Sequence, residues 1–181
     1  MTLVDRLRAR PRPLRIAVDG RSGSGKSTFA KLLAKDLGAT LIEGDDFYIG
    51  GTALRDEPPE ALAASCIDWR RQRDVLDTLT AGRTGRFRPF DWAAFDGSSG
   101  PETLVPPAEI IILEGVYSAR HELADLIDAA LLVTTAPATR EARLLAREGE
   151  ITAWERQWHR AEEWYFAHAA PPERFDHIIE T

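Results

Sequence analysis

The stretch "IAVDGRSGSGKSTFAKLLAKDLG", Ile16 to Gly38, decides the fold. It joins a short apolar run, Leu14–Asp19, to a segment whose apolar residues recur at helical spacing. Between the two, Gly20–Ser27 reads GRSGSGKS and matches the pattern G-x-x-x-x-G-K-[ST]. Because this pattern follows a predicted strand and opens a predicted helix, it predicts a phosphate-binding loop.

The residue types in this loop suit a nucleoside triphosphate. Glycines let successive backbone N–H groups point at phosphate oxygens, and the start of the helix adds partial positive charge. Lys26 adds a full charge for the terminal phosphates, and the Ser27 hydroxyl can bind Mg²⁺. The expected nucleotide-binding residues are Gly20, Gly23, Ser24, Gly25, Lys26, Ser27 and Thr28.

Length and composition indicate one domain, residues 1–181, without internal repeats. The net charge of −6 opposes generic binding to nucleic acid or acidic membranes, and no apolar run is long enough to cross a bilayer. The single cysteine, Cys66, excludes an internal disulfide and fits a reducing cytoplasm. We therefore expect a cytoplasmic protein with a small-molecule partner, and the sequence leaves open whether it forms a homo-oligomer.

Strands and helices alternate along the chain, which predicts an α/β fold of three layers: a mostly parallel five-stranded sheet with helices on both faces. The expected strands are Leu14–Asp19, Ala39–Glu43, Glu109–Gly115, Ala129–Thr135 and Asp176–Glu180. The expected helices are Ser27–Leu37, Ile67–Leu79, Arg140–Arg147 and Thr152–His168.

Two segments fall outside this pattern. Residues 1–13 carry several arginines, and we interpret them as a solvated basic leader, with a binding arm as the alternative. Residues 83–107 are rich in Gly, Pro and Ser, and a loop of that length is usually functional or disordered. We expect this loop on the acceptor side of the site.

The motif "EGDDFY", Glu43 to Tyr48, follows the second predicted strand. Residues just past the carboxyl ends of parallel strands line the ligand crevice, so Asp45 and Asp46 should lie beside the terminal phosphate. A carboxylate there can orient an acceptor hydroxyl and take its proton. The alternative, capping of a turn or helix, is stronger for Asp46 than for Asp45.

Taken in order, the motifs resemble one family. The phosphate loop is followed by "DDFY", by "CIDW" opening a helix, by "RPFDW", by "ILEG" at the end of a buried strand and by the arginine-bearing "TREARLLARE". This order is similar to that of the uridine kinase and nicotinamide riboside kinase group of P-loop nucleoside kinases. The loop motif is highly specific by itself, whereas the shorter motifs support the resemblance only because they occur in this order.

The resemblance implies roles for three carboxylates. Asp45 would accept the proton of the acceptor hydroxyl, and Asp68 would hold ribose hydroxyls, with an ordinary helix N-cap as its alternative. Glu114 would lie near Mg²⁺ together with Ser27, or else be a simple polar strand end.

The resemblance also implies a short helical lid at residues 140–152. Arg140, Arg143 and Arg147 share one face of the predicted helix, and such arginines neutralise phosphate charge in the family. A solvated stripe is the alternative. We expect Arg143 and Arg147 to act in catalysis, alongside Lys26 and Asp45.

The aromatic residues depart from the family. Uridine kinases carry Tyr-Asp-Phe and then a histidine that reads the base, whereas this chain has Phe90-Asp91-Trp92 and then Phe95. Phenylalanine cannot hydrogen-bond a pyrimidine, which puts uridine and cytidine in doubt as acceptors. Tyr48, Phe90, Trp92 and Phe95 are candidates for stacking on a flat ring, or for filling a loop core. The stripe of Trp154, Trp158 and Tyr165 is interpreted mainly as core.

The resulting hypothesis is an ATP- and Mg²⁺-dependent kinase for a small hydroxylated metabolite, a nucleoside or similar riboside. Two alternatives stay open. One is a kinase of another small alcohol, such as a sugar acid or a pantothenate-like compound. The other is a non-catalytic module that binds ATP and signals through a partner.

Overall fold

The computed structural model describes residues 1–181 and contains a five-stranded, all-parallel sheet with the strand order β2-β5-β1-β6-β7. The strands are β1 (Leu14–Asp19), β2 (Thr40–Glu43), β5 (Ile110–Glu114), β6 (Ala129–Thr134) and β7 (His177–Glu180). The predicted fold class is therefore confirmed, and each predicted strand lies within one residue of its observed bounds.

Six α-helices surround the sheet, and their bounds follow caps and breakers in the sequence. They are α1 (Leu3–Arg8), α2 (Lys26–Leu37), α3 (Pro59–Ser65), α4 (Trp69–Thr80), α5 (Pro137–Glu148) and α6 (Ala153–Trp164). Gly38 ends α2 in the left-handed conformation, with φ 65°, where glycine carries no Cβ penalty. Thr152 begins α6 with a capping box to Glu155.

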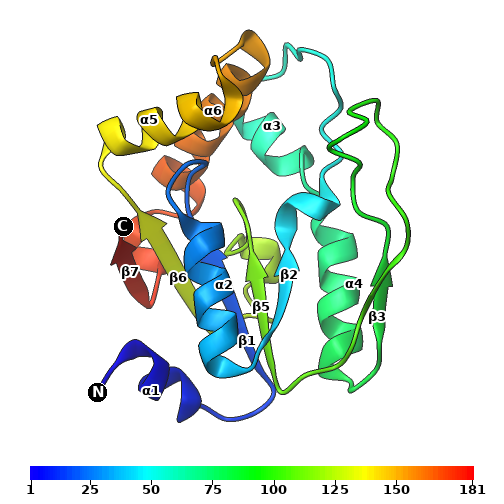
Figure 1. The fold of residues 1–181 in the computed structure, drawn as a ribbon, viewed down its shortest axis with the longest axis vertical. Helices are drawn as coiled ribbons and strands as arrows, with labels where there is room; N and C mark the ends of the chain where they lie inside the picture. The colour runs from blue at the N-terminus through cyan, green and yellow to red at the C-terminus, as the bar shows by residue number, and fades with distance from the viewer.

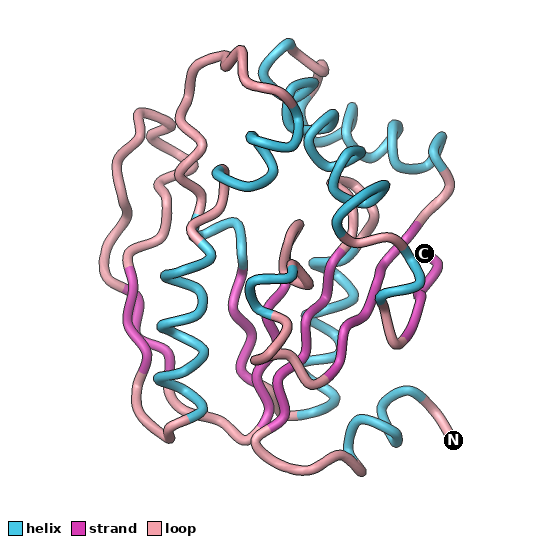
Figure 2. The backbone as a smooth tube through the Cα atoms, turned by 180° about the vertical axis from the view of Figure 1, so that it is seen from behind, coloured by secondary structure: helices cyan, strands magenta, loops and turns pink.

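The core forms two layers, one on each face of the sheet, because neighbouring strand residues point to opposite faces. On β5, Ile110 and Ile112 pack with α1 and α2, whereas Ile111 and Leu113 pack with α3, α4 and α6. Figure 1 shows α5 and α6 crossing above the carboxyl ends of the strands. Figures 1 and 2 place both chain ends on the β7 side of the molecule.

The structure differs from the sequence interpretation at several places. The basic leader contains α1, and Leu7 is buried against the core, so the segment is not simply solvated. The loop 83–107 is bracketed by the antiparallel strands β3 (Gly85–Phe87) and β4 (Thr103–Val105). The last predicted helix divides into α6 and a π-helix at Tyr165–Ala169. No helix has the length and apolar character needed to span a membrane.

Candidate active site

The phosphate-binding loop connects β1 to α2 at the carboxyl end of the sheet. Its glycines adopt conformations that other residues rarely reach, with φ 154° at Gly20, 80° at Gly23 and 90° at Gly25. A Cβ at Gly20 would lie 2.4 Å from the carbonyl oxygen of Val133, so only glycine fits there. Lys26 is buried at the first position of α2.

Ser27 and Glu114 meet at the end of β5. The Ser27 hydroxyl donates to Oε1 of Glu114 over 3.0 Å. Burial raises the pKa of Glu114 to about 7, Lys26 opposes the rise, and Asp45 adds to it. A hydroxyl and a carboxylate oxygen are ligands that Mg²⁺ accepts. Since no group of three or more His, Cys, Asp or Glu side chains forms a metal cluster here, a bound Mg²⁺ would also need phosphate oxygens or water as ligands.

Asp45 and Asp46 lie in a 3₁₀ turn, Gly44–Phe47, directly after β2. The turn approaches the end of β5 closely, because a Cβ at Gly115 would lie 3.5 Å from Oδ1 of Asp45. The Asp45 carboxylate is exposed and lies next to the strand end that carries Glu114. Burial raises the pKa of Asp46 to about 6, and the nearby Glu43 and Asp45 carboxylates add to that rise.

A cavity of about 750 Å³ extends from Asp45 and Asp46 to the edge of the loop. Of the predicted site residues, Asp45, Tyr48, Trp92, Phe95 and Arg147 line it. Ser22, from the phosphate-binding loop, also lines it, as do Trp154 and Trp158 of α6. The two tryptophans, interpreted mainly as core from the sequence, therefore also form a wall of this cavity.

Two predicted acceptor residues lie outside the lining. Asp68 caps α4, with its carboxylate accepting a hydrogen bond from the Arg71 N–H over 3.2 Å, which is the alternative left open by the sequence. Phe90 is buried behind the cavity, with its ring 5.0 Å from that of Tyr48 and 4.7 Å from that of Trp92, centroid to centroid. Phe90 supports the aromatic wall without lining the cavity.

The three arginines of α5 behave differently. Arg143 donates from Nη1 to the carbonyl oxygen of Ser24 over 3.3 Å, and Arg140 donates from Nε to that of Ser22 over 2.7 Å. Arg147 pairs with its exposed neighbour Glu148 at 2.5 Å and lines the cavity. Arg140, which the sequence did not single out beyond its place in the stripe, contacts the loop as directly as Arg143.

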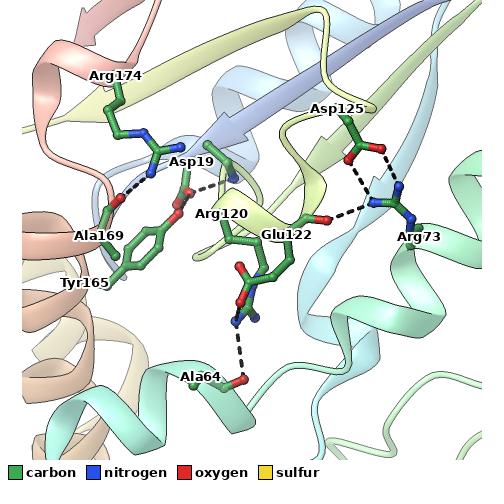
Figure 3. Close-up of polar contacts among 10 residues, drawn as sticks. Asp19, Ala64, Arg73, Arg120, Glu122, Asp125, Tyr165, Ala169 and Arg174 are labelled. Carbon is green, nitrogen blue, oxygen red and sulfur yellow. Dashed lines mark hydrogen bonds and ion pairs between the residues drawn. The ribbon is translucent and has the colours of Figure 1, made fainter.

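The sequence reasoning missed Asp19, the last residue of β1. Its fully buried carboxylate accepts hydrogen bonds from the backbone N–H groups of Gly20, Tyr117 and Ala119. It also accepts one from the Tyr165 hydroxyl over 3.0 Å (Figure 3). Asp19 thereby ties the start of the phosphate-binding loop to the segment after β5 and to the π-helix. An acidic residue ending an otherwise apolar strand directly before the loop was the available signal.

Folding changes the acidity of Asp19, which predicts a pH dependence of stability. Burial raises its pKa from 3.8 to about 6. The hydrogen bonds that it accepts and the charge of Lys26 act in the opposite direction and limit this rise. The folded protein therefore holds this proton at pH values where the unfolded chain has lost it, so the stability that it contributes is lost as pH rises from 3.8 to about 6. Relative to Asp19→Asn, the wild type should lose about 2 kcal/mol of unfolding free energy between about pH 4.5 and about pH 7.

Urea unfolding of both proteins across this pH range measures the difference. A difference that stays flat, or grows as pH rises, would show that Asp19 is ionised throughout in the folded protein.

Comparisons with known proteins find similarity to kinases. No family model matches the chain. A uridine kinase from Clostridium perfringens is 27% identical over 144 residues, which cover 76% of this chain and 69% of that protein. A cytidylate kinase from Streptococcus sanguinis is 41% identical over 64 residues, which cover 34% of this chain and only 28% of that protein.

Solved structures share the fold over nearly the whole chain. A possible uridine kinase from Bacillus stearothermophilus superposes with a TM-score of 0.71 at 20% identity, covering 98% of this chain and 95% of that one. Phosphoribulokinase from Rhodobacter spheroides superposes with a TM-score of 0.64 at 16% identity, covering 92% of this chain and 69% of that one.

The chain is therefore similar in sequence to a uridine kinase over most of its length, and it shares the fold of solved kinase structures. This similarity to uridine kinases confirms the resemblance predicted from the order of motifs.

Proposed function

We propose that this protein is a cytoplasmic, ATP- and Mg²⁺-dependent kinase that phosphorylates a hydroxyl group of a nucleoside or other riboside. One observation carries the proposal: a single cavity is bounded by the phosphate-binding loop at Ser22, by the carboxylate of Asp45 and by a wall of aromatic rings. A nucleotide held by the loop would therefore lie beside the proposed base and a surface suited to a flat ring.

The loop, the turn after β2 and helix α5 each contribute residues to the proposed transfer. The backbone N–H groups of Gly23–Ser27 and the ammonium group of Lys26 hold the β- and γ-phosphates. Asp45 accepts the hydroxyl proton as the acceptor oxygen bonds to the γ-phosphorus and the bond to the departing ADP breaks. Arg143 and Arg147 neutralise charge on the transferred group.

Ser27 and Glu114 would hold Mg²⁺, which supplies charge neutralisation on the phosphates when it is bound. Their contact over 3.0 Å brings two oxygen ligands to one place beside the loop. The buried ammonium of Lys26 stabilises the ionised form of Glu114, the form that binds a cation.

The aromatic wall supports a flat acceptor. Trp92 and Phe95 are stacked, with their planes 23° apart and ring centroids separated by 6.4 Å, and both side chains are exposed at the cavity. Exposed aromatic faces beside a polar site favour stacking against a planar ring. The planar base of a nucleoside or similar riboside meets this requirement, whereas an acyclic sugar acid has no flat ring.

The test is consumption of ATP with a panel of ribosides, sugars, sugar acids and pantothenate-like alcohols. At least one riboside should raise ADP production well above the rate without acceptor, and mass spectrometry should detect the phosphorylated riboside. Turnover that no compound raises above the bare ATPase rate would contradict the kinase proposal. Phosphorylation of a sugar acid but of no riboside would contradict the acceptor class.

A further inference from the structure

A buried carboxylate on α6 holds the tip of the phosphate-binding loop. Glu162 is only 3% exposed. The backbone N–H of Ser22 donates to its Oε2 over 3.0 Å, and the Ser22 hydroxyl donates to its Oε1. Both oxygens of one carboxylate are therefore engaged by a single loop residue that lies 140 positions earlier in the chain.

Arg140 completes this contact from α5. Its Nε donates to the carbonyl oxygen of Ser22 over 2.7 Å, and its Nη2 lies 3.6 Å from Oε2 of Glu162. The Arg140–Glu162 pair thus binds the N–H, the hydroxyl and the carbonyl of Ser22. Hydrogen bonds to charged groups are stronger than those between neutral groups, so this arrangement fixes the tip of the loop.

The surroundings leave the loop little freedom to shift. A Cβ at Gly23 would lie 3.0 Å from both the carbonyl oxygen of Arg140 and Cγ of Leu144, so α5 packs directly on the loop backbone. Ser22 and Glu162 also line the acceptor cavity. The contact lies at the boundary between the phosphate side and the acceptor side of the site.

Glu162 also balances charge beside the loop. The guanidinium group of Arg21 lies 5.0 Å from the centroid of the Phe166 ring. Its pKa is lowered by burial and by Arg140, while Glu162 acts in the opposite direction. Two guanidinium groups near the loop therefore share one buried carboxylate. Removing that carboxylate would take away the buried negative charge that faces these two half-buried guanidinium groups.

Building on the proposed kinase function, we propose that Glu162 is a positioning residue that preorganises the phosphate-binding loop through Ser22 and Arg140. It does not touch the nucleotide itself. Its carboxylate holds the loop tip and the α5 guanidinium in the arrangement that receives the phosphates, so the nucleotide does not have to order them on binding.

The first test is Glu162→Gln, which preserves side-chain size and removes the charge. Affinity for the non-hydrolysable ATP analogue AMP-PNP with Mg²⁺ is measured by calorimetry. We expect a loss of about tenfold or more, because Gln offers Ser22 one neutral acceptor in place of two charged oxygens. Glu163→Gln is the matched control, since this neighbour is exposed on the same helix and should bind within about twofold of the wild type.

A double-mutant cycle with Arg140→Gln separates positioning from a general structural role. If Glu162 acts through Arg140, the double variant should bind AMP-PNP no more weakly than Glu162→Gln alone, because both charges are then gone. A loss equal to the product of the two single losses would overturn the proposal, as would wild-type affinity in Glu162→Gln. A lowered melting temperature with unchanged affinity would also overturn it.

Should Glu162→Gln fail to fold, Ser22→Ala removes only the hydroxyl that contacts the carboxylate. It should weaken AMP-PNP binding a few-fold, and unchanged binding would contradict the proposal. The assay needs no acceptor, so its outcome is separate from that of the proposed function. A wild type that binds AMP-PNP but phosphorylates no acceptor would contradict only the kinase proposal.

Discussion

Asp45→Asn is expected to lower the rate of phosphoryl transfer by about 10²- to 10⁴-fold, the usual contribution of a positioned general base. The asparagine side chain has nearly the same shape but cannot take the proton of the acceptor hydroxyl. Because Asp45 lies outside the phosphate-binding loop, the dissociation constant for ATP should stay within a few-fold of wild type. Steady-state kinetics and calorimetry with AMP-PNP measure the two quantities separately.

Asp46→Asn is the matched control, because the two carboxylates are neighbours in the same turn and both line the cavity. Its effect on kcat should be smaller than about tenfold if Asp45 is the base. A larger loss in Asp46→Asn than in Asp45→Asn would reassign the base to Asp46. If Asp45→Asn still transfers phosphate at the wild-type rate, Asp45 does not take the proton of the acceptor hydroxyl.

Lys26→Ala should lower kcat/KM for ATP by at least about 10²-fold, comparable to the loss of one electrostatic donor in other active sites. The ammonium group is buried beside two carboxylates, Asp19 and Glu114, and it lowers the pKa of each. Without it, the phosphates lose their cation, and the two carboxylates lose the positive charge that favours their ionised forms.

Lys35→Ala provides the comparison for this variant, because Lys35 is an exposed residue in the last turn of the same helix. Its kinetics should match those of the wild type within about twofold. Wild-type ATP affinity and turnover in Lys26→Ala would mean that the loop does not hold the nucleotide in the way proposed.

Sequence patterns predicted the scaffold well because local signals and tertiary structure agree there. The run Leu14–Asp19 forms β1 with the same bounds, since an apolar run stopped by glycine has few alternatives in a buried sheet. Helix α3, Pro59–Ser65, escaped prediction because it is short and begins within the run Glu57-Pro58-Pro59-Glu60. Its place is set by packing against α6 rather than by local preference.

Local motifs name candidate site residues, whereas contacts between distant parts of the chain appear only in the structure. Asp45 and the loop follow from local motifs, and in the structure Asp45 lines the same cavity as one loop residue, Ser22. The contact of Glu162 with Ser22 joins residues 140 positions apart, and periodicity within one helix gives no sign of it. At Asp68 a local motif leaves two interpretations open, because an Asp before a helix can hold a sugar or cap the helix. The structure shows the cap.

The most direct test is a crystal structure with Mg²⁺, AMP-PNP and an acceptor found in the activity screen. We predict that the γ-phosphate lies against the loop amides and Lys26, with the acceptor hydroxyl within about 3 Å of the Asp45 carboxylate and facing the γ-phosphorus. A structure in which Asp45 faces bulk solvent, away from both the hydroxyl and the terminal phosphate, would contradict this arrangement.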